Sequence, residues 1–389
     1  MDFIDLKAQQ KRIKDKIESN IRSVLNHGRY IMGPEIEELE LRLSEYTGVN
    51  HAIACSSGTD ALLLSLMALD TGPGDAVFTT PFTFVATAEV VSVLGATPVF
   101  VDIEPDTFNM SPTGLDLAIQ AVEASDPGIH PLPRTEHSAL RPKAVIPVDL
   151  FGLPADYDSI ISAAAGHNLP VVEDAAQSLG GVYKGRKACA LGEIGCTSFF
   201  PAKPLGAYGD GGMCFTRDRS LAHTIRSLVV HGQGSDKYEN VRIGINGRLD
   251  TLQAAILLAK LEIFPEELDL RAQAAERYNR LLSSAVSDLT LPLLPEGYSS
   301  AWAQYSVLAR DRSHRNLLQG RLQEAGIPTA IYYPTPLHLQ PAYEALGYLR
   351  GDFPISEDCA SRIFSLPMHP YLDPADQERI AEAMSTAER

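Results

Sequence analysis

Short runs of consecutive apolar residues alternate with longer amphipathic segments through the first half of the chain. An apolar run of about four to eight residues bounded by turn residues is typical of a buried strand, whereas apolar positions that recur every three to four residues indicate a helix. These patterns predict strands at 51–55, 76–80, 97–103, 144–150 and 170–174, and helices at 12–27, 34–46, 56–69, 87–95 and around 156–166. Such alternation is typical of an α/β fold, a mostly parallel sheet with helices on both faces.

The pattern changes near residue 249, where two long helical segments follow each other, LDTLQAAILLAKLEIF and PEELDLRAQAAERYNRLLSSA. Beyond them we predict strands at 304–309 and 329–333 and helices at 316–326 and 373–386. Because the second long helix is expected to bridge to a smaller domain, we place the N-terminal segment and a large domain at 1–262. A small C-terminal domain then covers 263–389.

One segment has no apolar period. Residues 122–143 carry four prolines and are predicted to form an exposed loop. His130 and His137 lie in it, and we interpret them as loop residues rather than metal ligands, so no metal site is expected.

Charge and cysteine usage narrow the function classes. The 389 residues carry a formal net charge of −16, which disfavours nucleic acid or an anionic membrane as the main partner. No stretch approaches the roughly 18 to 20 apolar residues of a membrane span, and the charged N-terminus lacks the apolar core of a signal peptide. The five cysteines are scattered and form no close pair, which favours free thiols in a reducing cytoplasm.

Two segments carry the candidate chemistry. Asp174 ends the apolar run 170–174, where open α/β sheets place their ligands. Lys203 follows Phe199 and Phe200 and precedes a glycine-rich stretch, 204–212, whose backbone can approach a ligand closely. Either residue alone fits a surface lysine or a helix cap. Together they match pyridoxal phosphate (PLP) chemistry, in which a lysine forms an imine and a carboxylate keeps the ring nitrogen protonated.

A phosphate site is predicted where the strand at 51–55 turns into the helix at 56–69. Gly58 and Thr59 lie at that helix N-terminus, where backbone N–H groups and the helix dipole favour an anion. An ordinary helix cap would have the same sequence. Ser198 offers a second hydroxyl at the same sheet edge. Phe84 could stack on a pyridine ring, although either nearby phenylalanine also fits a plain core position, and Gln177 could donate to the ring hydroxyl.

These segments together resemble the DegT/DnrJ/StrS-type PLP-dependent sugar aminotransferases of fold type I. The resemblance runs from IDLKAQQ at residue 4 through SSGTDAL, PFTFVATAE, VVEDAAQS, SFFPAKPLG, GDGG and NGRLDTLQAAIL to SLPMHP at 365–370, and so covers essentially the whole chain. It implies a large domain with a mostly parallel seven-stranded sheet and a smaller α+β C-terminal domain. Relative to the family, residues 122–143 look like an insertion of roughly twenty residues.

The resemblance also implies residue roles. Lys203 would hold the cofactor and move the proton, Asp174 would pair with the ring nitrogen, and Gln177 would contact the ring oxygen. The phosphate ligands would be Gly58, Thr59 and Ser198, with Phe84 stacking on the ring. Asn246 would reach the phosphate of the neighbouring subunit, which implies a homodimer with shared active sites. Related sugar dehydratases have histidine in place of Lys203, so the lysine favours transamination.

The substrates implied are L-glutamate as donor and a nucleotide-linked keto sugar as acceptor. The best match is the branch that aminates C3 of UDP-2-acetamido-2-deoxy-3-oxo-hexuronic acids, in which Arg248 would pair with the sugar carboxylate. Tyr208, Tyr332, Tyr333 and His338 would line the sugar pocket.

Three alternatives remain open. The acceptor could be a dTDP- or GDP-linked 3- or 4-keto-6-deoxy sugar, because the same Asn-x-Arg pattern occurs in relatives that act on neutral sugars. The chain could also be a non-catalytic relative that serves as a regulator. A dinucleotide-dependent oxidoreductase is disfavoured because SSGTDAL lacks the G-x-G-x-x-G spacing.

Overall fold

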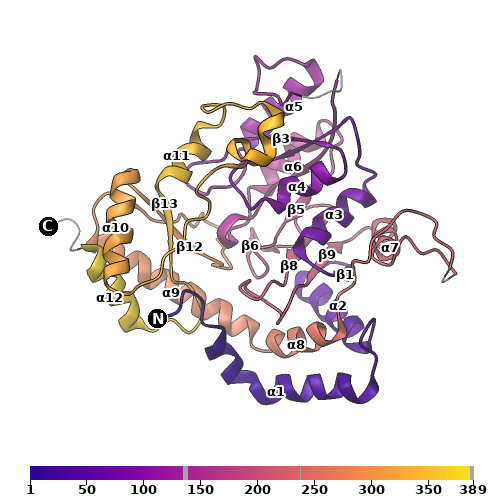
Figure 1. Ribbon diagram of the computed structural model, residues 1–389, viewed down its shortest axis with the longest axis horizontal. Helices are drawn as coiled ribbons and strands as arrows, with labels where there is room; N and C mark the ends of the chain where they lie inside the picture. The colour runs from indigo at the N-terminus through magenta and orange to yellow at the C-terminus, as the bar shows by residue number, and fades with distance from the viewer. Residues whose placement is uncertain (135–138, 237, 386–389) are drawn as a thin grey trace.

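The computed structural model describes residues 1–134, 139–236 and 238–385. Its centre is one sheet formed by two smaller ones, with strand orders β3-β2-β4 and β5-β8-β9-β1. Parallel bridges from Val145 to Val171 and from Val148 to Asp174 join β4 to β5. The strands are β1 (His51–Cys55), β2 (Asp75–Thr79), β3 (Thr97–Phe100), β4 (Arg141–Ile146), β5 (Val172–Asp174), β8 (Ile194–Ser198) and β9 (Gly212–Thr216). Within the described residues the sheet is therefore seven-stranded and mostly parallel, and only β9 runs antiparallel to its neighbours (Figure 1).

Helices cover both faces of this sheet because successive strand side chains point to opposite sides. Ile53 packs in one core with residues of α3 (Gly58–Ala68), α4 (Ala86–Val93) and α7 (Arg219–Leu228). Its neighbours Ala52 and Ala54 pack on the other side, against α2 (Pro34–Thr47) and α8 (Thr251–Leu261). Farther along that side, α5 (Pro112–Ala124) and α6 (Tyr157–Ala165) cover β2, β3 and β4. The predicted α/β architecture is confirmed.

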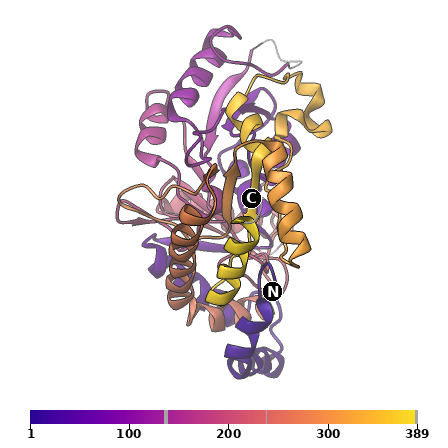
Figure 2. The same ribbon diagram turned by 90° about the vertical axis from the view of Figure 1, so that its left-hand side faces the viewer.

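The C-terminal part has an antiparallel sheet of its own, with strand order β10-β12-β13. These strands are β10 (Leu289–Thr290), β12 (Tyr305–Ala309) and β13 (Ile363–Leu366). They share a core with α9 (Phe264–Ala285), α10 (Arg312–Glu324) and α12 (Pro374–Ser385), which lie side by side in Figure 2. The division into domains at residue 262 stays a prediction.

The remaining elements connect these two parts. Helix α1 (Leu6–His27) packs along α8, and α11 (Pro354–Arg362) precedes β13. A small sheet, β11-β6-β7, is formed by β6 (Val182–Tyr183), β7 (Arg186–Lys187) and β11 (Tyr298–Ser299). Three 3₁₀ turns, η1 (Leu150–Gly152), η2 (Leu337–Leu339) and η3 (Pro341–Leu346), complete the described structure.

Two expectations were wrong. Residues 329–333 form no strand, because Ala330 makes only a single bridge to Ser365. The predicted exposed loop 122–143 is exposed only in part: its start belongs to α5 and its end to β4, residues 125–129 are exposed as predicted, and residues 130–133 are buried or half-buried. His130 is buried, and one of its ring nitrogens lies 2.8 Å from the carbonyl oxygen of Phe100. The Arg134 backbone N–H donates to Leu346, and His137 lies outside the described residues.

No helix among the described residues has the length and apolar character needed to cross a membrane.

Candidate active site

The loop that carries Lys203 is closed at both ends by the central sheet. Ser198, the last residue of β8, pairs with Gly212, the first residue of β9. Inside this closure the Phe199 N–H donates to Gly211 at 2.7 Å and the Lys203 N–H donates to Phe200 at 2.9 Å. A Cβ on Gly206 would collide with the Pro201 carbonyl, so the loop turns back at a position that only glycine fits. Lys203 is therefore held at the carboxyl edge of the sheet.

Asp174 ends β5 at the same edge and is only 5% exposed. Its carboxylate accepts a hydrogen bond of 2.8 Å from the Thr87 hydroxyl and one of 3.2 Å from the Ala176 N–H. Burial raises the pKa of Asp174, while these two donors and the charge of Lys203 oppose the rise. The remaining lone pairs can accept from a protonated ring nitrogen.

Lys203 and Asp174 influence each other electrostatically. Burial lowers the pKa of the Lys203 ammonium from its ordinary value, and the Asp174 charge partly offsets this effect. A lowered pKa increases the fraction of neutral amine, which is the nucleophilic form. The pair therefore places a lysine suited to attack a carbonyl next to a carboxyl group.

The predicted phosphate site is a narrow cradle at the N-terminus of α3. Gly58 is the first residue of this helix, and a Cβ there would lie 2.6 Å from the Ser198 Cβ. The Ser57 side chain caps the helix by accepting from the Asp60 N–H at 3.0 Å, and Thr59 is half-buried on the first turn. The backbone of β8 thus approaches a helix N-terminus closely, which leaves donors directed at one spot for an anion.

Aromatic residues lie beside Gln177. The Gln177 side chain donates to the Tyr333 hydroxyl at 3.3 Å and accepts from the Phe151 N–H at 2.7 Å. Phe84 is 55% exposed with its ring 6.3 Å from that of Tyr333, so its outer face is available for stacking. Phe82, in contrast, is fully buried in the core.

The other predicted sugar-pocket residues pack against side chains of this protein. Tyr208 packs with α1 and α8, and its buried hydroxyl has no hydrogen-bond partner in the described part of the chain. His338 is buried against Phe353, with a ring nitrogen 3.1 Å from Glu357. Tyr332 is half-buried and its ring lies 6.4 Å from that of Phe3. Substrate contacts by these residues stay predictions.

Asn246 and Arg248 follow a loop, 230–246, whose ends are joined by a bridge from Val230 to Asn246. This loop comes after α7 and projects from the body at the right of Figure 1. Asn246 is exposed, and the buried Nε of Arg248 has no hydrogen-bond partner among the described residues. Both side chains are therefore available to an external partner.

Sequence reasoning did not identify two supporting residues. Thr87 lies in the PFTFVATAE segment, and its hydrogen bond to Asp174 spans 87 positions. Lys260 on α8 is 1% exposed, and its ammonium donates to the Gly206 carbonyl at 2.6 Å and lies 4.4 Å from the Tyr208 ring centre. Lys260 could have been identified from the sequence, because a single lysine interrupts the apolar pattern of the helix that carries it.

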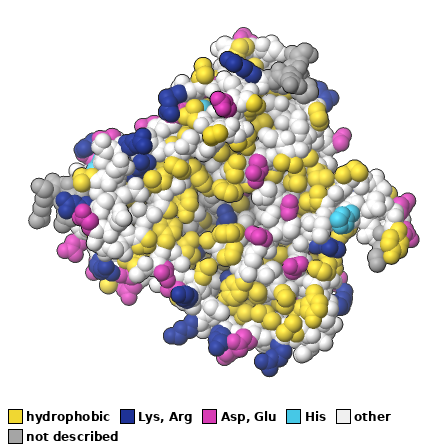
Figure 3. Space-filling view, viewed as in Figure 1, with side chains coloured by type: hydrophobic (Ala, Val, Ile, Leu, Met, Phe, Trp, Pro, Cys, Tyr) yellow, Lys and Arg dark blue, Asp and Glu magenta, His cyan; other side chains and the backbone are white. Residues whose placement is uncertain are grey.

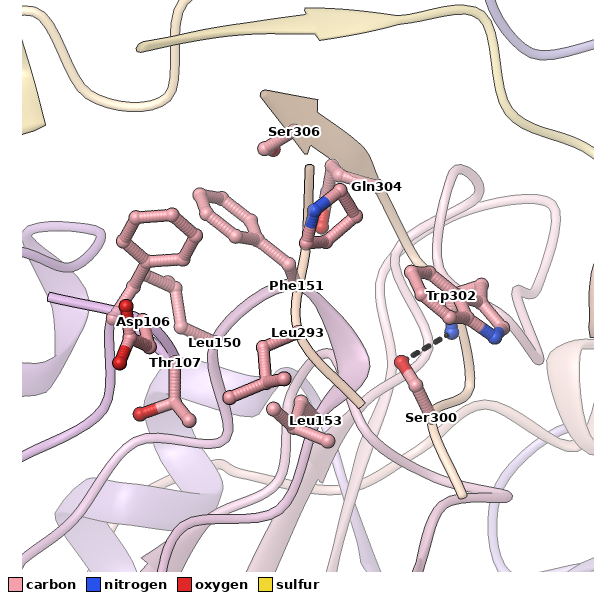
Figure 4. Close-up of a pocket in the computed structure, with 12 residues that line it drawn as sticks. Asp106, Thr107, Leu150, Phe151, Leu153, Leu293, Ser300, Trp302, Gln304 and Ser306 are labelled. Atoms are coloured by element: carbon pink, nitrogen blue, oxygen red, sulfur yellow. Dashed lines mark hydrogen bonds between the residues drawn. The ribbon is translucent and has the colours of Figure 1, made fainter. Parts of the chain in front are cut away.

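The described residues contain no cluster of three or more histidine, cysteine, aspartate or glutamate side chains suited to a metal ion. A cavity of about 20 Å³ lies near η1 and is lined by Phe151, Trp302 and Gln304 (Figure 4). It has room for about one water molecule and does not fit a cofactor.

The groups at the sheet edge do fit a phosphorylated pyridine ring. Gly58 lets Ser198 approach the N-terminus of α3 closely, where a phosphate could bind, Asp174 supplies the carboxylate for a ring nitrogen, and Lys203 supplies the amine. When bound, PLP would act as an electron sink for carbon acids. The fold and the site thus define the class, a fold type I enzyme that depends on PLP.

Comparisons with known proteins give the family. The chain belongs to the DegT/DnrJ/EryC1/StrS aminotransferase family, whose model matches residues 11–385. It is 48% identical over 385 residues, covering 99% of each chain, to the UDP-2-acetamido-2-deoxy-3-oxo-D-glucuronate aminotransferase of Pseudomonas aeruginosa. A solved family member from Brucella abortus is 50% identical, with a TM-score of 0.92 and 99% of both chains covered.

The cofactor assignment is also supported by a solved relative. The PLP form of a putative sugar aminotransferase from Streptococcus pneumoniae is 26% identical, with a TM-score of 0.84 and 96% and 95% of the two chains covered. The chain is therefore a PLP-dependent aminotransferase, and the resemblance drawn from its motifs is confirmed.

Proposed function

We propose that this aminotransferase moves an amino group from L-glutamate to C3 of a UDP-linked 2-acetamido-2-deoxy-3-oxo-hexuronic acid. The similarity to the Pseudomonas aeruginosa enzyme extends over 99% of both chains. The observation that carries the proposal is Arg248, whose buried Nε lacks a partner among the described residues. A guanidinium with free donors is suited to a bidentate bond with a sugar carboxylate.

We also propose roles for the residues at the sheet edge. Lys203 binds the cofactor covalently and moves the proton of the donor carbon. Asp174 pairs with the ring nitrogen, Gln177 with the ring oxygen, and Phe84 covers the ring. Gly58, Thr59 and Ser198 hold the phosphate.

A homodimer with shared sites forms part of this proposal. Several large apolar side chains are between 44% and 88% exposed near the projecting loop: Tyr30, Ile31, Met32, Val241 and Ile243. Ile31 forms a bridge to Asp250, two residues after Arg248 in the sequence. Tyr30, Ile31 and Met32 therefore lie near the Arg248 segment. Figure 3 shows apolar side chains on the projecting loop and across the middle of the same face. Contiguous apolar surface of this kind supports burial against a second copy, to whose cofactor phosphate Asn246 would then reach.

A cytoplasmic location is supported by the five cysteines, all of which are free and buried.

The first experiment is an absorption spectrum with PLP before and after L-glutamate is added. We expect a visible band that moves to shorter wavelength with glutamate, and no such band for Lys203→Ala. Lys184→Ala serves as the control, because that lysine is exposed and paired with Asp158 at 2.8 Å. A band that glutamate leaves unchanged would refute glutamate as the donor.

The acceptor is tested with two UDP-3-keto sugars that differ only in having a carboxylate or a hydroxymethyl group at C5. Loss of a charge-assisted bond of about 1.5 to 3 kcal/mol predicts that Arg248→Ala lowers kcat/KM for the uronic acid roughly 10- to 100-fold. For the neutral sugar, the same substitution should change kcat/KM by less than about threefold. Arg310→Ala is the control, because that arginine is 60% exposed and paired with Asp288 at 2.9 Å. Equal losses on both sugars would remove the carboxylate assignment and favour a neutral acceptor.

A further inference from the structure

Two turns at the carboxyl ends of β4 and β5 are bonded to each other directly behind the cofactor site. The Asp149 N–H donates to the Asp174 carbonyl at 3.1 Å, and the Phe151 N–H donates to the Gln177 side chain at 2.7 Å. The third bond runs from the Ser178 hydroxyl to Oδ2 of Asp149, at 2.6 Å. A fourth bond joins the Asp174 N–H to the Pro147 carbonyl at 3.0 Å, so the turn that carries Asp174 and Gln177 is attached to the turn after β4 at four places.

Asp149 is the centre of this arrangement. Its side chain is fully buried, and Oδ1 accepts from the Ala155 N–H and from the Tyr157 hydroxyl, both at 2.9 Å. It forms no ion pair with any residue that the structure describes. Burial raises the pKa of Asp149 to about 7, and the charge of Asp174 adds to the rise. A buried acid without a cation costs stability, and here three donors to its two carboxylate oxygens offset that cost.

The other side of the turn after β4 packs in a core with Phe82 and Phe108 that leaves one small cavity. Leu150 and Phe151 line the cavity of about 20 Å³ shown in Figure 4. Phe151 also has a backbone φ of 60°, in the left-handed region that a bulky residue adopts only under constraint. Asp149 fixes the chain on the other side of Phe151, because it accepts from the Gly152 N–H at 3.3 Å with its carbonyl and from the Ala155 N–H at 2.9 Å with its carboxylate.

We propose that Asp149 is a positioning residue of the cofactor site: through Ser178 and the backbone of Asp174 it fixes the turn that presents Asp174 and Gln177 to the ring. The inference rests on the proposed ring contacts of those two residues. Asp149 itself touches neither the ring nor the substrate.

The test measures binding of pyridoxamine phosphate, which forms no covalent bond and so reports the ring contacts alone. Asp149→Ala removes all three side-chain bonds and should weaken binding about 10- to 100-fold. Asp149→Asn restores the contacts, since its oxygen can accept from Ala155 and Tyr157 while its amide donates to the Ser178 hydroxyl, and should bind within about threefold of the wild type.

Ser178 and Tyr157 provide a matched pair, because each donates one hydroxyl to the same carboxylate but only Ser178 lies on the turn of the site. Ser178→Ala should weaken binding about 3- to 10-fold, whereas Tyr157→Phe should change it less than about twofold even if both lower the melting temperature. This pair keeps the proposal testable if Asp149→Ala does not fold.

Two results would overturn the proposal: wild-type affinity in Asp149→Ala, or equal weakening by Tyr157→Phe and Ser178→Ala. Asp174→Ala separates this outcome from failure of the proposed function. If Asp174→Ala binds pyridoxamine phosphate normally, the assigned ring contact is wrong. If it binds poorly while the Asp149 variants bind well, only the positioning role fails.

Discussion

Lys260 gives the molecule a dependence of stability on pH that one substitution should remove. The lysine is 1% exposed and donates to the Gly206 carbonyl, and it forms no ion pair with a described residue. Burial lowers its pKa from 10.5 to about 8. In the unfolded chain the ordinary value returns, so between these two pH values the unfolded state binds more protons than the folded state.

This difference in bound protons sets the sign and the size of the change in unfolding free energy with pH. Stability rises with pH where the unfolded state binds more protons, by at most 1.36 kcal/mol per pH unit for one group, which is about 2 kcal/mol from pH 8 to 9.5. Below pH 8 the folded protein carries the full cost of the buried charge, about 3 kcal/mol on the same scale. Lys260→Met removes this cost but leaves the Gly206 carbonyl without its donor, a loss of about 1 to 3 kcal/mol.

We therefore expect Lys260→Met to be about as stable as the wild type at pH 7 and less stable by roughly 2 kcal/mol at pH 9.5. The assay is urea unfolding at pH 7, 8, 9 and 9.5 with PLP in excess and one protein concentration throughout. Lys16→Met is the control, because that lysine is 49% exposed and should follow the wild type at every pH. A difference between Lys260→Met and the wild type that stays constant within about 0.5 kcal/mol across the series would refute the reasoning.

Three further predictions concern the cofactor and the dimer. Thr87→Val removes a hydrogen-bond donor that lowers the pKa of Asp174, so this pKa should rise further. Cofactor affinity measured by fluorescence titration should therefore fall about 3- to 10-fold at neutral pH and recover as the pH rises. Gly58→Ala places a Cβ 2.6 Å from the Ser198 Cβ and so forces Ser198 away from the N-terminus of α3. It should weaken PLP binding at least tenfold, about 1.4 kcal/mol; unchanged affinity would exclude a phosphate there. Ile243→Asp puts a charge on a side chain that is 88% exposed in one chain and should shift the species seen by sedimentation from dimer to monomer; a dimer of unchanged stability would place the interface elsewhere.

The sequence identified five strands of the central sheet, including β5 with Asp174, and missed β8 and β9, which flank the loop of Lys203. HAIAC is an uninterrupted apolar run and matches β1 residue for residue. The segments IGCTS and GMCFT of β8 and β9 contain glycine, cysteine and threonine, so they lack a clear strand period. The opposite error occurred at 329–333, where the aromatic and β-branched residues of TAIYY imitate a strand but Ile331, Tyr332 and Tyr333 pack around Phe82 instead.

For the candidate site, motifs located the residues at strand ends but not those that act across the fold. Asp174 and Lys203 were predicted because each lies in a short characteristic segment. The contact of Lys260 with Gly206 spans 54 positions and that of Ser178 with Asp149 spans 29. Such pairs depend on the order of strands in the sheet, which hydrophobic periodicity does not encode.

The strand order also sets when the phosphate cradle can exist during synthesis. Within the part of the chain that the structure describes, β1 has β9 as its single strand partner, so residues 51–55 cannot pair before residues 212–216 are synthesised. Translation of the intervening chain takes on the order of 10 to 30 seconds. During this time the apolar α3 has neither β8 nor β9 to pack on, and Gly58 has no Ser198 beside it. A nascent chain that ends before β9 therefore has an incomplete cradle and an apolar α3 that lacks part of its core.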